Sequence, residues 1–154
     1  MSRNNGESPG RAKPEELTAE SPFTLPGFFT ALSEGRLLGG RCDECEQAFV
    51  PPRPACYACG SREIAVEEQP RAGTIVTDTE VTRPAPAFEA AAPLTIAIVE
   101  LESGARLTGR VAADYEAVEI GTAVELTIRE LTDQEKEFAL DHEEEWPLHV
   151  FEPV

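Results

Sequence analysis

Four cysteines are the residues of this chain whose types and spacing point most directly to chemistry. They form two CxxC pairs, Cys42 with Cys45 and Cys56 with Cys59, separated by ten residues, and the chain holds no other cysteine. Each pair offers two thiolates on one short turn, and a connection of this length brings the second pair opposite the first. The spacing predicts one structural zinc ion bound by all four sulfurs. Because four thiolates fill a tetrahedral shell, we expect no reaction at the metal.

Three other uses of the cysteines compete with zinc. Two disulfides need an oxidising compartment, and the sequence shows no export signal. A redox-active CxxC needs a thioredoxin-like βαβ setting, which is absent from the pattern. Iron fits the same rubredoxin-like spacing. However, Glu46 stands where a glycine such as Gly60 often follows the second cysteine of a knuckle. Glycine eases the positive φ that directs amide groups to the sulfurs, so we interpret Glu46 as favouring zinc.

The remaining residues offer no catalytic constellation. The sequence has no G-x-S-x-G elbow, no phosphate-binding glycine loop and no H-E-x-x-H. Its two histidines, His142 and His149, lie near the C-terminus, and His142 sits in an acidic run typical of a solvated turn. Trp146, the only tryptophan, either packs on a barrel rim or forms a docking patch with Phe151. We therefore expect a protein that is not itself an enzyme.

The composition excludes several classes of partner. Thirteen basic and 29 acidic residues give a net charge of −16, which argues against nucleic acid because phosphate binding uses clustered Lys and Arg. No apolar run reaches the length of about 18 residues that a membrane span needs. Residues 1–20 contain Leu17 as their only large aliphatic residue after the initiator, so they are predicted to be a disordered tail and not a signal peptide. The predicted location is cytoplasmic.

The elements that must position the cysteines are short. Residues 21–39 are predicted as a helical segment, because apolar residues recur at roughly helical spacing, and 40–69 as the zinc ribbon. Residues 70–154 change to a strand pattern, with candidate strands at 74–82, 94–101, 105–111, 123–131, 136–140 and 148–151. Short strands joined by hairpins, without helices of βαβ length, predict a small closed OB-fold barrel, and an open sandwich is the alternative.

Several apolar residues in the first half of the chain are candidates for a partner surface. They are Phe28, Phe29, Leu32, Phe49, Pro51 and Pro52. A solitary small protein needs fewer exposed apolar residues than this, and contiguous apolar patches usually mark interfaces. We therefore expect these side chains to be exposed and to bind a partner, although the helix has the alternative role of capping its own domain.

The order of these features resembles the zinc-ribbon and OB-fold acyl-CoA-associated family known as domain of unknown function 35. The similarity runs from about residue 28 to residue 153. Its motifs are the helical element 28–37, the two C-x-x-C knuckles, Pro51-Pro52-Arg53, Gly73-Thr74-Ile75, the strand 93–101, Ile120-Gly121 and Phe151-Glu152-Pro153. The chain departs from the family pattern at Glu46, in the Ala/Pro-rich loop 83–92 and in the acidic insert 141–146.

The resemblance implies a mainly β fold and an accessory role. The fold would comprise an N-terminal helical segment, a rubredoxin-like zinc ribbon and a small OB-fold β-barrel. Members of this family accompany thiolases, thiolase-like aldolases, HMG-CoA synthases or MaoC-type enoyl-CoA hydratases. The resemblance therefore implies structural Zn²⁺, with CoA or acyl-CoA as a ligand shared with the partner enzyme. The alternative of another class is a zinc-ribbon/OB module that binds single-stranded nucleic acid, against which the scattered basic residues argue.

Overall fold

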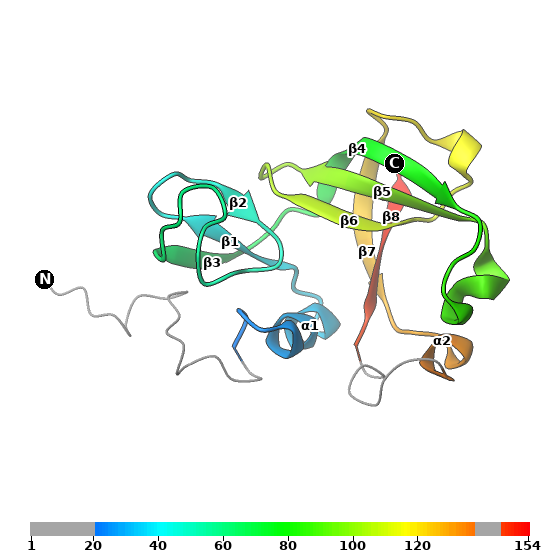
Figure 1. The fold of residues 1–154 in the computed structure, drawn as a ribbon, viewed down its shortest axis with the longest axis horizontal. Coiled ribbons are helices and arrows are strands. Elements are labelled where there is room, and N and C mark those ends of the chain that lie inside the picture. The colour runs from blue at the N-terminus through cyan, green and yellow to red at the C-terminus, as the bar shows by residue number, and fades with distance from the viewer. Residues whose placement is uncertain (1–20, 138–145) are drawn as a thin grey trace, which may run out of the picture. The chain divides into compact units, whose positions relative to one another are not determined.

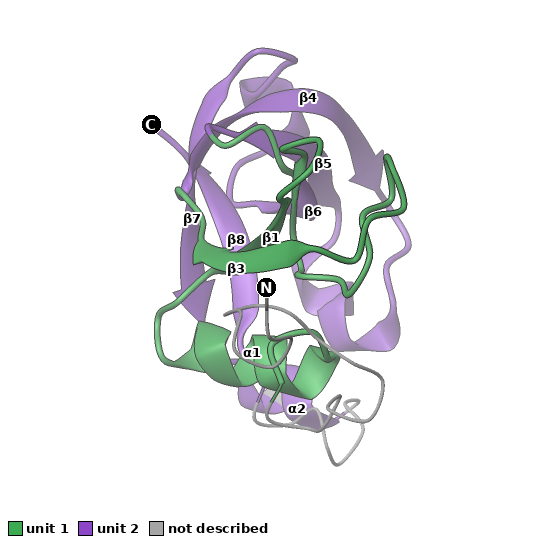
Figure 2. Cartoon of the chain, turned by 90° about the vertical axis from the view of Figure 1, so that its left-hand side faces the viewer, with its two compact units in different colours: residues 1–70, 103–105 green, residues 71–102, 106–154 purple. Residues whose placement is uncertain are grey.

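The computed structural model describes residues 21–137 and 146–154 (Figure 1). The chain divides into two compact units (Figure 2). The first unit extends to Pro70 and includes Ser103–Ala105, and the second holds Arg71–Glu102 and Arg106–Val154. The predicted mainly β fold class, with a helical segment, a ribbon and a barrel, is confirmed. The predicted tail, 1–20, and His142 lie outside the described residues. No described helix is long and apolar enough to cross a membrane.

Helix α1 (Leu25–Ser33) is the predicted N-terminal helix, and local signals mark both of its ends. The Thr24 hydroxyl accepts a hydrogen bond of 3.3 Å from the N–H of Gly27, which satisfies one of the free donors of the first turn. Gly35 follows the last turn with a φ of 85°, a left-handed conformation that commonly ends a helix at glycine.

The prediction that the apolar residues of the first half of the chain are exposed is wrong for most of them, and Phe29 and Pro51 are half-buried. Phe28 is 5% exposed, Leu32 is 0% exposed and Phe49 is 3% exposed. Phe29 is half-buried, and its ring meets that of Phe28 edge-on with centroids 5.3 Å apart. Pro52 is buried as well. Helical spacing reveals an apolar face, but the chain itself covers this one.

The first unit contains a three-stranded antiparallel sheet in the order β2-β1-β3. Its strands are β1 (Leu38–Cys42), β2 (Ala48–Phe49) and β3 (Ile64–Glu68). Strand β1 begins inside the segment predicted as helical. Gly40 of β1 pairs with Phe49, and a Cβ at Gly40 would lie 2.6 Å from the Phe49 ring. Glycine is needed at this position because the ring lies directly against the strand.

The second unit is a closed five-stranded barrel in the order β4-β5-β6-β8-β7. Its strands are β4 (Ala72–Val81), β5 (Leu94–Leu101), β6 (Arg106–Val111), β7 (Ala123–Arg129) and β8 (Leu148–Pro153). The 3-10 turns η3 (Pro86–Ala91) and η4 (Tyr115–Ala117) lie in the connections that follow β4 and β6. Strands β6 and β8 pair in parallel, and the other neighbours are antiparallel. The closed barrel excludes the open sandwich.

Alternation along the strands fills the barrel interior. On β5, Ala97 and Val99 are 2% and 0% exposed, whereas Ile98 between them is 36% exposed. Phe151 of β8 is 0% exposed, and a Cβ at Gly109 of β6 would lie 2.7 Å from its ring. Phe151 is therefore a core residue, which excludes it from the docking patch with Trp146 that was one of two alternatives.

Helix α2 (Asp133–Glu137) occupies the start of the segment predicted as a strand at 136–140. Thr132 and Glu135 form a capping box: the N–H of Glu135 donates to the Thr132 hydroxyl at 3.3 Å, and the N–H of Thr132 donates to the Glu135 carboxylate at 2.9 Å. Arg129 of β7 donates two more hydrogen bonds to that carboxylate, at 2.9 and 3.0 Å. The strand prediction is wrong for residues 136 and 137, and residues 138–140 lie outside the described ranges.

Candidate metal centre

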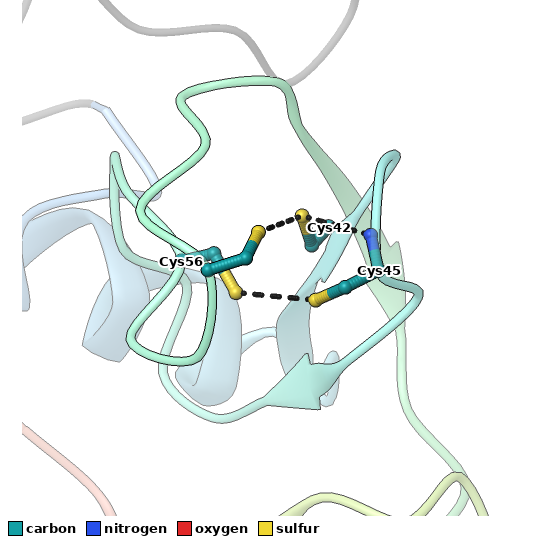
Figure 3. Close-up of side chains that lie close together, drawn as sticks. Cys42, Cys45 and Cys56 are labelled. Carbon is teal, nitrogen blue, oxygen red and sulfur yellow. Dashed lines mark hydrogen bonds between the residues drawn. The ribbon is translucent and has the colours of Figure 1, made fainter.

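The four cysteine sulfurs converge at one end of the ribbon (Figure 3). Cys42 ends β1, Cys45 lies in the turn to β2, and Cys56 and Cys59 lie in the loop between β2 and β3. All four sulfurs lie within 4.8 Å of one another, with 3.5 Å between Cys42 and Cys59 and 3.6 Å between Cys45 and Cys56. Zinc–sulfur bonds of about 2.3 Å give a tetrahedron with edges of about 3.8 Å. The cluster therefore fits a zinc ion held by four thiolates.

The two knuckles adopt the same type of backbone turn. Glu46 has a φ of 66° and Gly60 a φ of 80°, and their N–H groups donate to the carbonyls of Cys42 and Cys56 at 2.9 Å in each knuckle. Glu46 thus adopts the positive φ that was expected only of a glycine. Glu46 therefore does not disfavour iron as predicted, because the first knuckle directs its amide groups as the second does.

Arg41 supports the unusual backbone of the first knuckle. Its Nη1 donates a hydrogen bond of 3.0 Å to the carbonyl oxygen of Glu46, and its Nε lies 3.1 Å from the Glu67 carboxylate. A non-glycine residue in the left-handed region costs of the order of 1 kcal/mol. The charge-assisted bond from Arg41 offsets part of that cost.

The four thiols differ in acidity because the backbone and the neighbouring sulfurs act in opposite directions. The N–H of Cys45, 3.5 Å from the Cys42 sulfur, lowers the pKa of Cys42 to about 7. Burial acts to raise the pKa of Cys56, but N–H groups of its own knuckle outweigh burial and lower it. The Ser61 N–H acts to lower the pKa of Cys59, yet the neighbouring Cys42 sulfur and burial raise it to about 12. Holding all four sulfurs as thiolates requires a cation among them.

Comparison with known proteins assigns the chain to a family. The ChsH2 rubredoxin-like zinc ribbon domain matches residues 29–65, and the ChsH2 C-terminal OB-fold domain matches residues 66–129. A DUF35 domain-containing scaffold protein of Methanothermobacter thermautotrophicus is 35% identical over 101 residues, which cover 64% of this chain and 75% of that protein. The chain belongs to the DUF35 family. The resemblance inferred from the sequence motifs is therefore confirmed.

Two further relatives of this DUF35 chain extend the comparison. A DUF35 domain-containing scaffold protein of Methanocaldococcus jannaschii is 40% identical over 98 residues, covering 62% of this chain and 69% of that protein. The solved structure of the Ltp2-ChsH2(DUF35) aldolase matches with a TM-score of 0.64 and 30% identity, covering 82% of this chain and 91% of that chain. The likeness to ChsH2 thus spans both the ribbon and the barrel.

Burial divides the cysteines of this DUF35 chain into two pairs. Cys42 and Cys56 are buried, whereas Cys45 and Cys59 are exposed. The buried pair packs with Phe49 and Ile64 in a small apolar cluster beneath the knuckles. The sulfur tetrahedron has no vacant corner for a substrate, which is the arrangement of structural zinc sites.

The structure gives the second histidine a structural role. The Nε2 of His149 lies 2.8 Å from the carbonyl oxygen of Thr108, and its ring meets Phe151 edge-on with centroids 6.1 Å apart. The contact with Thr108 joins β8 to β6, and the ring contact with Phe151 lies within β8. No residue pattern near His149 distinguishes this cross-strand contact in the sequence.

Sequence reasoning did not single out Tyr57, which lies on the second knuckle. Tyr57 is 62% exposed, its ring meets Phe49 edge-on with centroids 6.0 Å apart, and the Arg53 guanidinium lies 6.0 Å from its centroid. Its place between two knuckle cysteines is a signal that was available, because residues inside a CxxC turn project to the surface.

Proposed function

We propose that this DUF35 chain is a non-catalytic subunit of a thiolase-superfamily enzyme, which would be a thiolase, a thiolase-like aldolase or an HMG-CoA synthase. The observation that carries the proposal is the match of 82% of this chain to ChsH2, a DUF35 chain joined with Ltp2 in an aldolase. The name scaffold protein given to the archaeal relatives supports the same division of labour. A MaoC-type enoyl-CoA hydratase is the alternative partner. The cytoplasmic location belongs to this proposal.

The metal in this proposal is one structural Zn²⁺ held by Cys42, Cys45, Cys56 and Cys59. The converging sulfurs and the match to a zinc ribbon domain support it. The ion would join the two knuckles and contribute to the folding of the ribbon. With all four positions taken by protein ligands, activation of water or substrate is left to the partner.

The barrel in this proposal helps to hold the CoA part of an acyl-CoA that is shared with the enzyme. The family resemblance and the OB-fold match support this role. The carbon–carbon chemistry is assigned to the enzyme subunit, since His149 is engaged by a backbone carbonyl and the cysteines by the metal.

Co-expression tests the proposal directly. The tagged chain is expressed with each thiolase-superfamily enzyme and each MaoC-type hydratase of the same organism. The molar mass of each complex is measured by size-exclusion chromatography with light scattering. We expect a stable complex with a thiolase-superfamily enzyme and no acyl-CoA turnover by the isolated chain. Acetyl-CoA, titrated calorimetrically, is expected to bind the complex more tightly than the enzyme alone. A chain that stays monomeric with every enzyme, or binds single-stranded DNA tightly at physiological salt, would refute the accessory role.

A further inference from the structure

The outer surface of strands β4, β5 and β6 carries side chains that are unusual for so acidic a chain. The pairing register places six of them in two adjacent rows, Thr77-Ile98-Thr108 and Thr79-Ile96-Arg110. We call these six residues the outer barrel face. Residues directly opposite on paired strands point to the same side, and alternation along β5 turns Ile96 and Ile98 away from the buried Ala97 and Val99.

The outer barrel face is open and carries no carboxylate. Its three threonines are exposed, Ile98 is 36% exposed and Ile96 is half-buried. In the next row, Glu100 is paired with Arg106 at 3.2 Å, so that row is neutral. The chain as a whole carries a net charge of −16. A face of threonines and isoleucines with one positive residue and no carboxylate therefore differs from the acidic character of the chain as a whole.

Arg110 supplies the positive edge and has no counterion in the described chain. Arg110 is half-buried as a residue, and within residues 21–137 and 146–154 its side chain makes no ion pair and no hydrogen bond. Other half-buried arginines do have partners: Arg41 lies 3.1 Å from Glu67, and Arg129 lies 2.9 Å from Glu135. A guanidinium without a carboxylate partner leaves its N–H donors available for an incoming acceptor.

The barrel topology restricts how a partner meets this face. Strand β4 is hydrogen-bonded to β5 and β7, and β6 is bonded to β5 and β8. Strand β4 pairs with β7 only at Ala72–Thr74, and β6 pairs with β8 only at Arg110 and Val111. The six side chains project from the face of the sheet, so a partner on this face makes contact through side chains. Five of the six side chains are β-branched and stiff at χ1, which reduces the entropy lost when they are immobilised in an interface.

We propose that the outer barrel face docks against the enzyme partner, which presents aliphatic side chains to Ile96 and Ile98 and a carboxylate to Arg110. This inference rests on the proposed function and names the surface that serves it. The charge of the outer barrel face favours an enzyme partner over a second copy of this chain or a nucleic acid. A second copy seated on the same face would bring two Arg110 side chains together without a carboxylate from either face, and a nucleic acid would meet one arginine instead of a basic cluster.

Matched variants test the docking face in the complex obtained by co-expression with the organism's thiolase-superfamily enzymes. Ile98→Asp is expected to weaken binding about 30-fold or more, as for a central interface residue, and Arg110→Glu about tenfold. Ile120→Asp makes the same chemical change at a 67% exposed isoleucine outside the face, and Arg83→Glu does so at an exposed arginine. Both controls are expected to stay within about twofold of the wild type.

The dissociation constants are measured by biolayer interferometry at several salt concentrations, after circular dichroism and zinc content show each variant to be folded. Binding of the wild type is expected to weaken with salt more steeply than binding of Arg110→Gln. Thr108→Glu, at an exposed position in the row of Ile98, replaces Ile98→Asp if that variant fails to fold.

The outcomes separate the two proposals. If the wild type binds no enzyme, the accessory role fails and the docking face fails with it. If the wild type binds while Arg110→Glu and the folded variant in the Ile98 row bind as tightly as the controls, the docking face is overturned and the accessory role stands. If the isolated chain dimerises and the variant in the Ile98 row abolishes that dimer, a second copy is the occupant and the proposal is overturned.

Discussion

Removal of the metal is expected to unfold the ribbon while the barrel stays folded. The hydrocarbon core beneath the knuckles consists of Phe49 and Ile64, with Phe23 packed against it. Burial of two such side chains contributes about 3–6 kcal/mol, whereas zinc binding in zinc-finger peptides contributes about 10–16 kcal/mol. Ordering each residue costs about 1–2 kcal/mol in chain entropy. The two side chains of this cluster therefore do not by themselves hold the knuckles, which run from Cys42 at the end of β1 to Ile64 at the start of β3.

Hydrogen exchange read by mass spectrometry provides the assay. The reduced protein is treated with a zinc chelator, and peptides from β1 and β3 are compared with peptides from β5 and β7. Protection is expected to vanish in the ribbon strands, to persist in the barrel strands and to return when zinc is added. Cys56→Ser is expected to give the same pattern without a chelator. Ribbon amides that stay protected in metal-free protein would show that side-chain packing suffices and would refute the reasoning.

Three further predictions concern packing and charge. Gly73→Ala is expected to destabilise the barrel by about 1–3 kcal/mol in urea titrations, because a Cβ would lie 2.5 Å from the Glu100 carbonyl oxygen, a backbone atom with little room to move; an unchanged midpoint would contradict this. Phe28→Asp is expected to lower the free energy of unfolding by about 3–5 kcal/mol because Phe28 is 5% exposed. Leu25→Asp, at a 54% exposed position of the same helix, is expected to change it by no more than about 0.5 kcal/mol. Equal shifts of the thermal midpoint in the two variants would count against this. Glu135→Gln is expected to cost about 1 kcal/mol at neutral pH. The Arg129 hydrogen bonds lower the pKa of Glu135, so this contribution is present above the ordinary carboxyl pKa of about 4.3 and is lost as the pH falls through the lowered value; a deficit that stays constant down to acid pH would argue against it.

The candidate metal ligands and most barrel strands were predictable because their signals are local. A CxxC pair needs only one short turn to aim two sulfurs, so spacing alone identified Cys42, Cys45, Cys56 and Cys59 as a set. Strands β4 to β8 overlap the predicted strands at 74–82, 94–101, 105–111, 123–131 and 148–151, which were marked by apolar and β-branched residues between turn signals. The predicted strand at 136–140 failed because the capping box of Thr132 and α2 starts a helix there.

The burial of apolar residues was decided by tertiary packing. Phe28 and Leu32 lie on a helical face that, in the sequence, fits a buried core and a partner surface equally well, and the fold buries both. Phe151 was a candidate for an interface, and the barrel closes around it. The free energy gained by burying a side chain depends on which residues from other parts of the chain surround it. Local periodicity does not identify those residues.

The outer barrel face likewise exists only in three dimensions. Thr77, Ile98 and Thr108 come from three strands, and the pairing register alone makes them neighbours. The composition predicted a strongly acidic protein, but the uncompensated charge of Arg110 depends on where the chain places its carboxylates. Short-range geometry was therefore predictable from the sequence alone. The tertiary fold determined which residues are neighbours across strands and which charges have counterions. Coulomb and packing energies depend on distance in space and not on separation in sequence.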